Sequence, residues 1–369
     1  MTRLPMGVLR VVALAAVAAG CGGVPLRAQE TVAVGVLAPL TSGVPAAARA
    51  AVQGATLAAE EARGGTGAAV ALIVLDDRGS AELATRLFAE LLDRQVVAVV
   101  GPLTDLTTAA VAPQAERAGV PLVSPGATGT MPYAGSSVFR TSLPAPAQAR
   151  ALAEHLIGAG ARRISVIHEG NDYGALVAMA FAQRVRALGG EIVGTRLYRD
   201  GERDFTRHAA GVMADGAEAV LIAGYPDEGA QIITALRQSG VQVPVAGSDA
   251  LYSADLVAWA GAAAEGVIVP APFVASEPIP AVQEFVGKYR RRYDETPDHY
   301  AAQAYDAMKI VTFAIRRGGR SPKAVRAALQ GLRRFPGATG EITFDRWGAP
   351  ERAVALARVQ NGRFELLRR

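Results

Sequence analysis

The sequence predicts an α/β protein of two units, each with a parallel β-sheet covered by helices. From Thr31 onward, short β-branched apolar runs alternate with longer amphipathic or alanine-rich stretches, and this order is typical of parallel strands joined by helices. The alternation restarts after Thr141. The chain has 369 residues, 50% hydrophobic and 20% charged, which is enough for two ordinary domains with full cores.

The first twenty residues are typical of an export signal. Residues 1–20 contain two arginines and a short apolar run that is too short to span a membrane. Small residues precede Cys21, the single cysteine of the chain, in a pattern that resembles the lipobox of bacterial lipoproteins. We therefore expect a periplasmic or otherwise extracytoplasmic protein that is lipid-anchored through Cys21. Ordinary cleavage nearby, for example after Ala28, is the alternative.

The elements follow in order along the chain. Strands of the first unit are predicted at 31–37, 69–75, 96–100 and 120–123, with helices ending at 63 and spanning 81–93 and 106–118. In the second unit a helix at 147–158 precedes strands at 163–168, 191–198, 219–222, 243–246 and 266–269. The tail adds helices at 280–292, 300–317 and 322–330, then strands at 341–344, 353–359 and 364–367. This terminal block must pack back onto the earlier units.

The strand-to-helix turns carry the candidate binding residues, because strand carboxyl ends and helix N-termini converge there in a parallel sheet. In the first unit, the turns at 101–105 and 124–128 are small and hydroxylic, which suits a carboxylate. In the second unit the turns contain Tyr173, Tyr225 and Asp249, which suit a cation and an apolar side chain. Two facing units with these linings would clasp a zwitterion. The alternative is structural, since such residues also cap helices, form turns or pack at a rim.

Composition and motifs disfavour several other classes of protein. A single cysteine excludes a disulfide framework and cysteine-based metal sites, and the four histidines stand far apart, so we expect no metal. The formal net charge is only +4 and the basic residues are scattered, so no nucleic-acid partner is expected. The sequence has no Walker A motif and no Gly-x-Ser-x-Gly elbow. We therefore expect neither an enzyme nor a cofactor.

Several segments, in order from about residue 31 to the C-terminus, resemble the leucine/isoleucine/valine-binding proteins of ABC importers. They are Ser124-Pro125-Gly126-Ala127-Thr128, 168–174, Asp204-Phe205, Gly224-Tyr225, Gly247-Ser248-Asp249 and 337–345. The resemblance implies the type I periplasmic-binding fold, with two Rossmann-like lobes joined by a three-crossover hinge. It further implies an N-terminal lobe of 30–141 plus 272–336 and a C-terminal lobe of 142–271 plus 337–369.

The resemblance also implies a ligand site. Its carboxylate side would be Thr104, Asp105, Gly126, Ala127 and Thr128, its ammonium side Asp249, and its walls Tyr173, Tyr225 and Tyr305.

Two positions depart from the family pattern. The family commonly has a hydroxyl residue where Asp105 stands, and an acid would repel a ligand carboxylate unless it points away as a helix cap. Both orientations remain open, as does a one-residue shift that lets Thr104 serve instead. The family's aromatic residue in the first turn falls near Ala47, so that wall is reduced.

The function implied by the resemblance is solute capture for an ABC importer. The ligand would be a branched-chain or other small amino acid, or a related amide or carboxylate, delivered by hinge closure to a permease of the inner membrane. We expect a monomer. An extracytoplasmic ligand sensor of the same fold is the alternative function.

Overall fold

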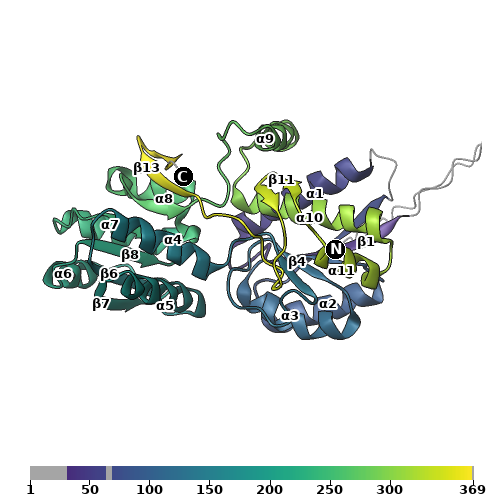
Figure 1. Cartoon of the computed structure of the whole chain (residues 1–369), viewed down its shortest axis with the longest axis horizontal. Helices are drawn as coiled ribbons and strands as arrows, with labels where there is room; N and C mark the ends of the chain where they lie inside the picture. Colours follow the sequence, from purple (N-terminus) through teal and green to yellow (C-terminus); the bar gives the residue numbers. More distant parts are fainter. Residues whose placement is uncertain (1–30, 64–68, 368–369) are drawn as a thin grey trace, which may run out of the picture.

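The structure, a computed structural model, describes residues 31–63 and 69–367 and consists of two units, each with its own sheet (Figure 1). The two sheets agree with the expected α/β fold class. The export segment 1–20 and Cys21 lie outside the described residues, so lipidation stays a prediction.

The first unit is built on a five-stranded sheet in the order β2-β1-β3-β4-β5, in which every neighbouring pair is parallel. The strands are β1 Val32–Ala38, β2 Val70–Asp76, β3 Val99–Val100, β4 Leu122–Ser124 and β5 Val138–Arg140. The first three helices are α1 Pro45–Arg63, α2 Ala81–Asp93 and α3 Asp105–Ala118. Apolar runs such as β1 fit this sheet because helices cover parallel strands on both faces.

The second unit is built on a seven-stranded sheet in the order β14-β13-β10-β9-β8-β6-β7. Its strands are β6 Arg163–Glu169, β7 Glu191–Tyr198, β8 Ala219–Ala223, β9 Val245–Gly247, β10 Ile268–Pro270, β13 Leu356–Gln360 and β14 Arg363–Leu366. The five strands from β7 to β10 are parallel, whereas β13 and β14 add antiparallel pairs at one edge. Its helices are α4 Ala145–Gly158, α5 Asp172–Ala187, α6 Thr206–Ala214, α7 Pro226–Gln238 and α8 Ala254–Ala260, with short 3₁₀ turns η1 Asp249–Leu251 and η2 Gly261–Ala264.

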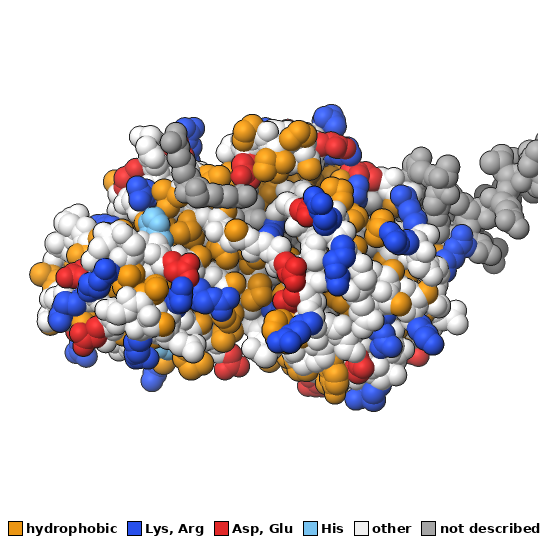
Figure 2. All heavy atoms as spheres, viewed as in Figure 1, with side chains coloured by type: hydrophobic (Ala, Val, Ile, Leu, Met, Phe, Trp, Pro, Cys, Tyr) orange, Lys and Arg blue, Asp and Glu red, His pale blue; other side chains and the backbone are white. Residues whose placement is uncertain are grey.

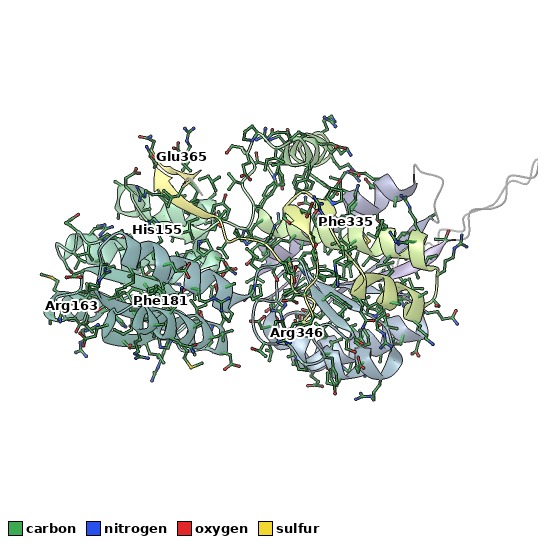
Figure 3. All side chains as sticks on the ribbon, viewed as in Figure 1. His155, Arg163, Phe181, Phe335, Arg346 and Glu365 are labelled. Atoms are coloured by element: carbon green, nitrogen blue, oxygen red, sulfur yellow. The ribbon has the colours of Figure 1, made fainter. Side chains whose placement is uncertain are left out.

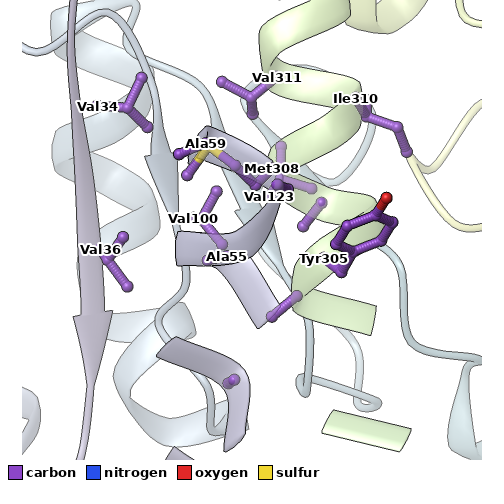
Figure 4. Packing of buried hydrophobic residues seen from close by; sticks show 14 of the residues in the cluster. Val34, Val36, Ala55, Ala59, Val100, Val123, Tyr305, Met308, Ile310 and Val311 are labelled. Carbon is purple, nitrogen blue, oxygen red and sulfur yellow. The ribbon is translucent and has the colours of Figure 1, made fainter. Parts of the chain in front are cut away.

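The C-terminal block returns to the first unit. It comprises α9 Pro280–Tyr293, α10 His299–Gly318, α11 Pro322–Gln330 and the strand pair β11 Phe335–Gly337 and β12 Gly340–Ile342. Figure 4 shows Met308 and Val311 of α10 packed with Ala55 of α1 and with Val34 of β1. Figure 3 places Phe335 beside these helices, while Phe181 lies inside the second unit.

The core of the first unit extends to Phe344. Ala338, Ile342 and Phe344 are buried in the same cluster as α1 and α10, because the β11–β12 pair lies against α10. The boundary expected at residue 337 therefore falls inside a segment that packs with the first unit.

The chain passes between the units three times: between β5 and α4, between β10 and α9, and between β12 and β13. Two of these crossings are tied together. The Thr141 hydroxyl donates to the Gln303 carbonyl oxygen at 2.8 Å, and the Arg352 guanidinium donates to the carbonyl oxygens of Thr339 and Thr141. Buried Asp306 accepts hydrogen bonds from the backbone N–H and the hydroxyl of Thr339 at 2.8 and 2.6 Å. Both crossings are thus anchored to α10.

Side-chain caps determine where many helices begin. Each capping side chain accepts a hydrogen bond from a backbone N–H of the first turn, as these residues prefer to do. The caps are Ser80, Thr104, Asn171, Ser253, Asp298 and Ser321. One sequence candidate, Thr104, is therefore a helix cap in this fold.

Candidate functional site

The candidate site lies between the two units, where turns of both sheets face each other. Figure 2 shows a shallow notch in the lower edge of the molecule where the two units meet. The charge of Asp105 in the first unit acts on Asp249 in the second. Tyr300, at the start of α10, lies in the field of both carboxylates and of Tyr225. Side chains from both units therefore converge on one place.

On the side of the second unit, Asp249 is the centre of a hydrogen-bonded group. The Tyr173 hydroxyl donates to its Oδ1 at 2.6 Å, and the Gln148 amide donates to its Oδ2 at 3.0 Å. The rings of Tyr173 and Tyr225 lie 5.6 Å apart, centroid to centroid, in a tilted arrangement. The sequence predicted this group except for Gln148, which comes from α4.

The Asp249 carboxylate is held in a partly desolvated position. Burial raises its pKa, the hydrogen bonds from Tyr173 and Gln148 oppose that rise, and the charge of Asp105 adds to it. Burial and the adjacent Asp249 also raise the pKa of Tyr173, so this phenol keeps its proton and remains a donor. A buried carboxylate with no cationic partner among these groups is suited to a positively charged ligand.

On the side of the first unit, the Asp105 carboxylate accepts hydrogen bonds from backbone N–H groups of the turn after β4. Its Oδ1 accepts from the N–H groups of Thr128 and Gly129 at 2.7 and 3.0 Å, and its Oδ2 lies 3.1 Å from the same Gly129 nitrogen. The Arg140 guanidinium donates to the Gly129 carbonyl oxygen at 2.6 Å and its charge acts on Asp105. Burial raises the pKa of Asp105, and these N–H groups and Arg140 oppose the rise.

This geometry resolves the open orientation of Asp105. The residue is not the helix cap, because Thr104 precedes it and accepts from the Thr107 N–H at 3.3 Å. The carboxylate instead bridges from the start of α3 to the turn after β4. It accepts from the N–H of Thr128, a residue that the resemblance had assigned to the ligand carboxylate.

The remaining first-unit candidates form the wall of the same turn. Ala127 is fully buried; its N–H donates to the Ser124 hydroxyl at 3.0 Å and its carbonyl oxygen accepts from Ser142. Gly126 permits a close approach, since a Cβ there would lie 2.4 Å from the Leu103 carbonyl oxygen. Both residues therefore shape the turn through their backbone.

Tyr305, expected to be a wall of the ligand site, lies elsewhere. Its hydroxyl donates to the Glu61 carboxylate at 3.0 Å, and its ring lies 4.5 Å from that of Phe285, centroid to centroid. The side chain is only 6% exposed and belongs to the core between α1 and α10. Tyr305 lies in this core because the side of α10 that carries it faces α1.

Tyr300 is the aromatic residue of α10 that faces the site, although it was not among the residues expected from the sequence. Burial raises its pKa, with Asp249 and Tyr225 as the next causes. The signal that could have found it is its place in the first turn of a predicted helix that follows a crossing. Its ring also lies 4.0 Å from that of the adjacent His299, centroid to centroid.

Glu169, the last residue of β6, is a second buried acid of the second unit. It is 7% exposed, and its Oε2 has no hydrogen-bond partner among the described residues. Burial raises its pKa, with the charges of Asp200 and Glu228 as further causes. Its charge acts in turn on Tyr225. The acidic character of the second-unit turns thus extends beyond Asp249.

Within residues 31–63 and 69–367, no group of three or more His, Cys, Asp or Glu side chains is placed to hold a metal ion. In the same residues, no helix combines the length and apolar character needed to cross a membrane.

Two units joined by three crossings, with side chains of both facing one site, define the class of two-lobed binding proteins. The sequence profile of the periplasmic binding protein family matches residues 31–363, so the chain belongs to that family. It is a solute-binding protein and not an enzyme.

Relatives and solved structures support the assignment. The chain is 27% identical over 334 residues to Leu/Ile/Val-binding protein homolog 3 of Brucella melitensis, covering 88% of this chain and 90% of the relative. The leucine-binding protein LivK of Thermotoga maritima superposes with a TM-score of 0.83 at 27% identity, covering 91% and 98% of the two chains. The branched-chain amino acid transporter protein LivJ of Streptococcus pneumoniae, solved with isoleucine, gives a TM-score of 0.82 at 25% identity, covering 92% and 99%.

Proposed function

We propose that this protein is the extracytoplasmic solute-binding component of an ABC importer, and that it captures a small amino acid or a related compound between its lobes. The observation that carries the proposal is the convergence of Asp105 and Tyr300 from one lobe with Asp249 and Tyr225 from the other. Several relatives are Leu/Ile/Val-binding proteins, and LivJ was solved with isoleucine.

Hinge closure is the mechanism we propose. A ligand that contacts both lobes favours the closed form, because only that form brings the two sets of contacts together. Asp249 would bind a ligand cation, and Tyr173, Tyr225 and Tyr300 would enclose its apolar part. The Thr128 turn, with Asp105 attached to it, would form the opposite wall.

The proposal includes the remaining sequence-based assignments. The N-terminal lobe would comprise 30–141 and 272–344, with its end moved from 336 to Phe344 because the core of that unit reaches this residue. The C-terminal lobe would comprise 142–271 and the rest of the chain. The protein would act as a monomer, tethered by a lipid on Cys21, and would present its ligand to a membrane permease. The mass of the mature N-terminal peptide tests lipidation.

The experiment that tests the binding function is ligand-dependent thermal stabilisation. Amino acids, amino acid amides, amines and small carboxylates would be screened against the purified protein. A ligand at a hundredfold its dissociation constant should add about 2.7 kcal/mol to the free energy of unfolding. Small-angle scattering with a stabilising ligand should show a smaller radius of gyration, as closure requires. No stabilisation by any compound in the four groups would contradict the proposal.

A further inference from the structure

The backbone donors that would receive a ligand carboxylate are already used by the protein itself. The N–H groups of Thr128 and Gly129 both point at the carboxylate of Asp105. Each N–H is a single donor, so a ligand carboxylate would gain these bonds only by displacing Asp105. The displaced carboxylate would then lie next to a second anion, which is unfavourable in a site with little water.

The turn is fitted around this internal carboxylate. A Cβ at Gly129 would lie 2.7 Å from Oδ2 of Asp105, so a larger residue at position 129 would force the acid to shift. Arg140, 4% exposed, holds the same turn through the Gly129 carbonyl oxygen at 2.6 Å and offsets the charge of Asp105. Asp105 is thus a fixed part of the wall.

The groups left at the other side of the site are acceptors. The carboxylate of Asp249 interacts with Tyr173, Gln148 and Asp105, and none of these three is a cation. Gln148 is 3% exposed, and its Oε1 has no partner among the described residues while its Nε2 is bound to Asp249. A buried acceptor without a donor is costly, and a ligand donor would satisfy it. Asp249 and Gln148 therefore present acceptors to a ligand, whereas the N–H groups of Thr128 and Gly129 are already bonded to Asp105.

We propose that the cleft selects small primary amines that lack a free carboxylate, such as amino acid amides and alkylamines. The ligand ammonium would bind Asp249 and Gln148, and the carboxylate of a free amino acid would be repelled by Asp105. This selectivity rests on the proposed function, since it concerns the same cleft between the lobes.

Matched ligand pairs test the selectivity by titration calorimetry. The purified protein would be titrated with the amides and the free acids of leucine, alanine and phenylalanine, and with isopentylamine. We expect the best amide or amine to bind at least about tenfold more tightly than the corresponding amino acid, as loss of hydrogen bonds to a charged group implies. A free amino acid that binds as tightly as its amide would overturn the proposal.

Variants of Asp105 test the cause. Asp105→Ser should release the N–H groups of Thr128 and Gly129 and shift the preference toward the free amino acid by at least about tenfold. Asp105→Asn keeps the shape of the side chain and should shift the preference in the same direction, should the serine variant fold poorly. Asp255→Ser, an exposed aspartate in the first turn of α8, is the matched control and should leave the preference unchanged. An unchanged preference in both Asp105 variants would overturn the proposal.

The outcomes separate the two proposals. Binding of amino acids in preference to amides would overturn the selectivity while supporting the solute-binding function. Absence of binding by every amide, acid and amine in this set, and of stabilisation in the wider screen, would contradict both.

Discussion

Replacing Asp249 by asparagine should weaken ligand binding strongly without destabilising the empty protein. Asparagine has nearly the same size, and its amide oxygen can still accept from Gln148, whose Nε2 also donates to the Leu143 carbonyl oxygen and therefore stays in place. Its amide nitrogen can donate to the Tyr173 hydroxyl oxygen, which now lies 2.6 Å from Asp249. The variant therefore removes the charge while the hydrogen-bonded group persists.

The expected magnitude follows from the burial of this carboxylate. Removing one partner of a buried, hydrogen-bonded charge pair typically costs about 2–5 kcal/mol of binding free energy, which is at least about thirtyfold in affinity. Stability should respond in the opposite direction. Because burial raises the pKa of Asp249, the ionised form that prevails at neutral pH is disfavoured in the folded state. A neutral asparagine should leave the free energy of unfolding unchanged or higher.

The assay combines titration calorimetry with urea unfolding of the empty protein. The ligand would be the best amine or amide from the screen, measured with wild type, Asp249→Asn and Asp255→Asn. Asp255 is exposed on α8 in the same unit, so this control makes the same change in net charge away from the cleft. Wild-type affinity in Asp249→Asn would refute the reasoning. A large loss of stability in that variant would show instead that the carboxylate holds the turn.

Tyr300→Ala should weaken ligand binding, measured by calorimetry. Tyr305→Phe should leave affinity unchanged and should lower the free energy of unfolding, measured in urea, by about 1 kcal/mol through loss of its hydrogen bond to Glu61. Equal effects of the two variants on affinity would contradict the assignment of Tyr300 to the site and Tyr305 to the core. Gly126→Ala should destabilise the protein by about 1–3 kcal/mol, because its Cβ would lie 2.4 Å from a carbonyl oxygen; wild-type stability in urea would contradict this. Burial lowers the pKa of His299 from 6.5 to about 4, so the unfolded state binds the proton first. The stabilising contribution of neutral His299 should be complete above about pH 6.5 and should decrease by about 3 kcal/mol as the pH falls to about 4. His299→Gln should flatten the dependence of the free energy of unfolding on pH in this range. An identical pH dependence in wild type and variant would contradict the role of His299.

The fold was largely predictable because strand and helix patterns differ in period and length. Runs such as 219–222 and helices such as 81–93 agree closely with β8 and α2. β5, Val138–Arg140, was not predicted as a strand, because three residues carry no periodicity and only pairing with β4 defines it. The predicted strand at 96–100 shortens to Val99–Val100 for the same reason, since strand length is set by the neighbouring strands.

The positions of the site were partly predictable and its contacts were not. The sequence placed Asp249 and Tyr225 correctly at turns after strands, because the parallel sheet brings those turns to one edge. It did not distinguish Tyr300 from Tyr305, because the face of α10 that meets the cleft depends on packing against α1. The partner of Asp105 lies 23 residues away on another turn, and no local pattern specifies such a contact.

The anchoring of the crossings limits where the molecule can bend. On the side of the first lobe, Thr141 is bonded to α10, and Arg352 is bonded to Thr141 and to Thr339, which Asp306 of α10 holds. On the side of the second lobe, the Leu143 carbonyl oxygen accepts from Gln148 on α4, and the Ala355 carbonyl oxygen accepts from the Ala271 N–H at 2.8 Å. The free length of chain between these attachments is only one residue in the crossing after β5 and two residues in the crossing before β13. Two short flexible segments side by side permit rotation about one axis and restrict rotation about the others. The lobes should therefore open and close about a single axis and return to the same closed geometry each time.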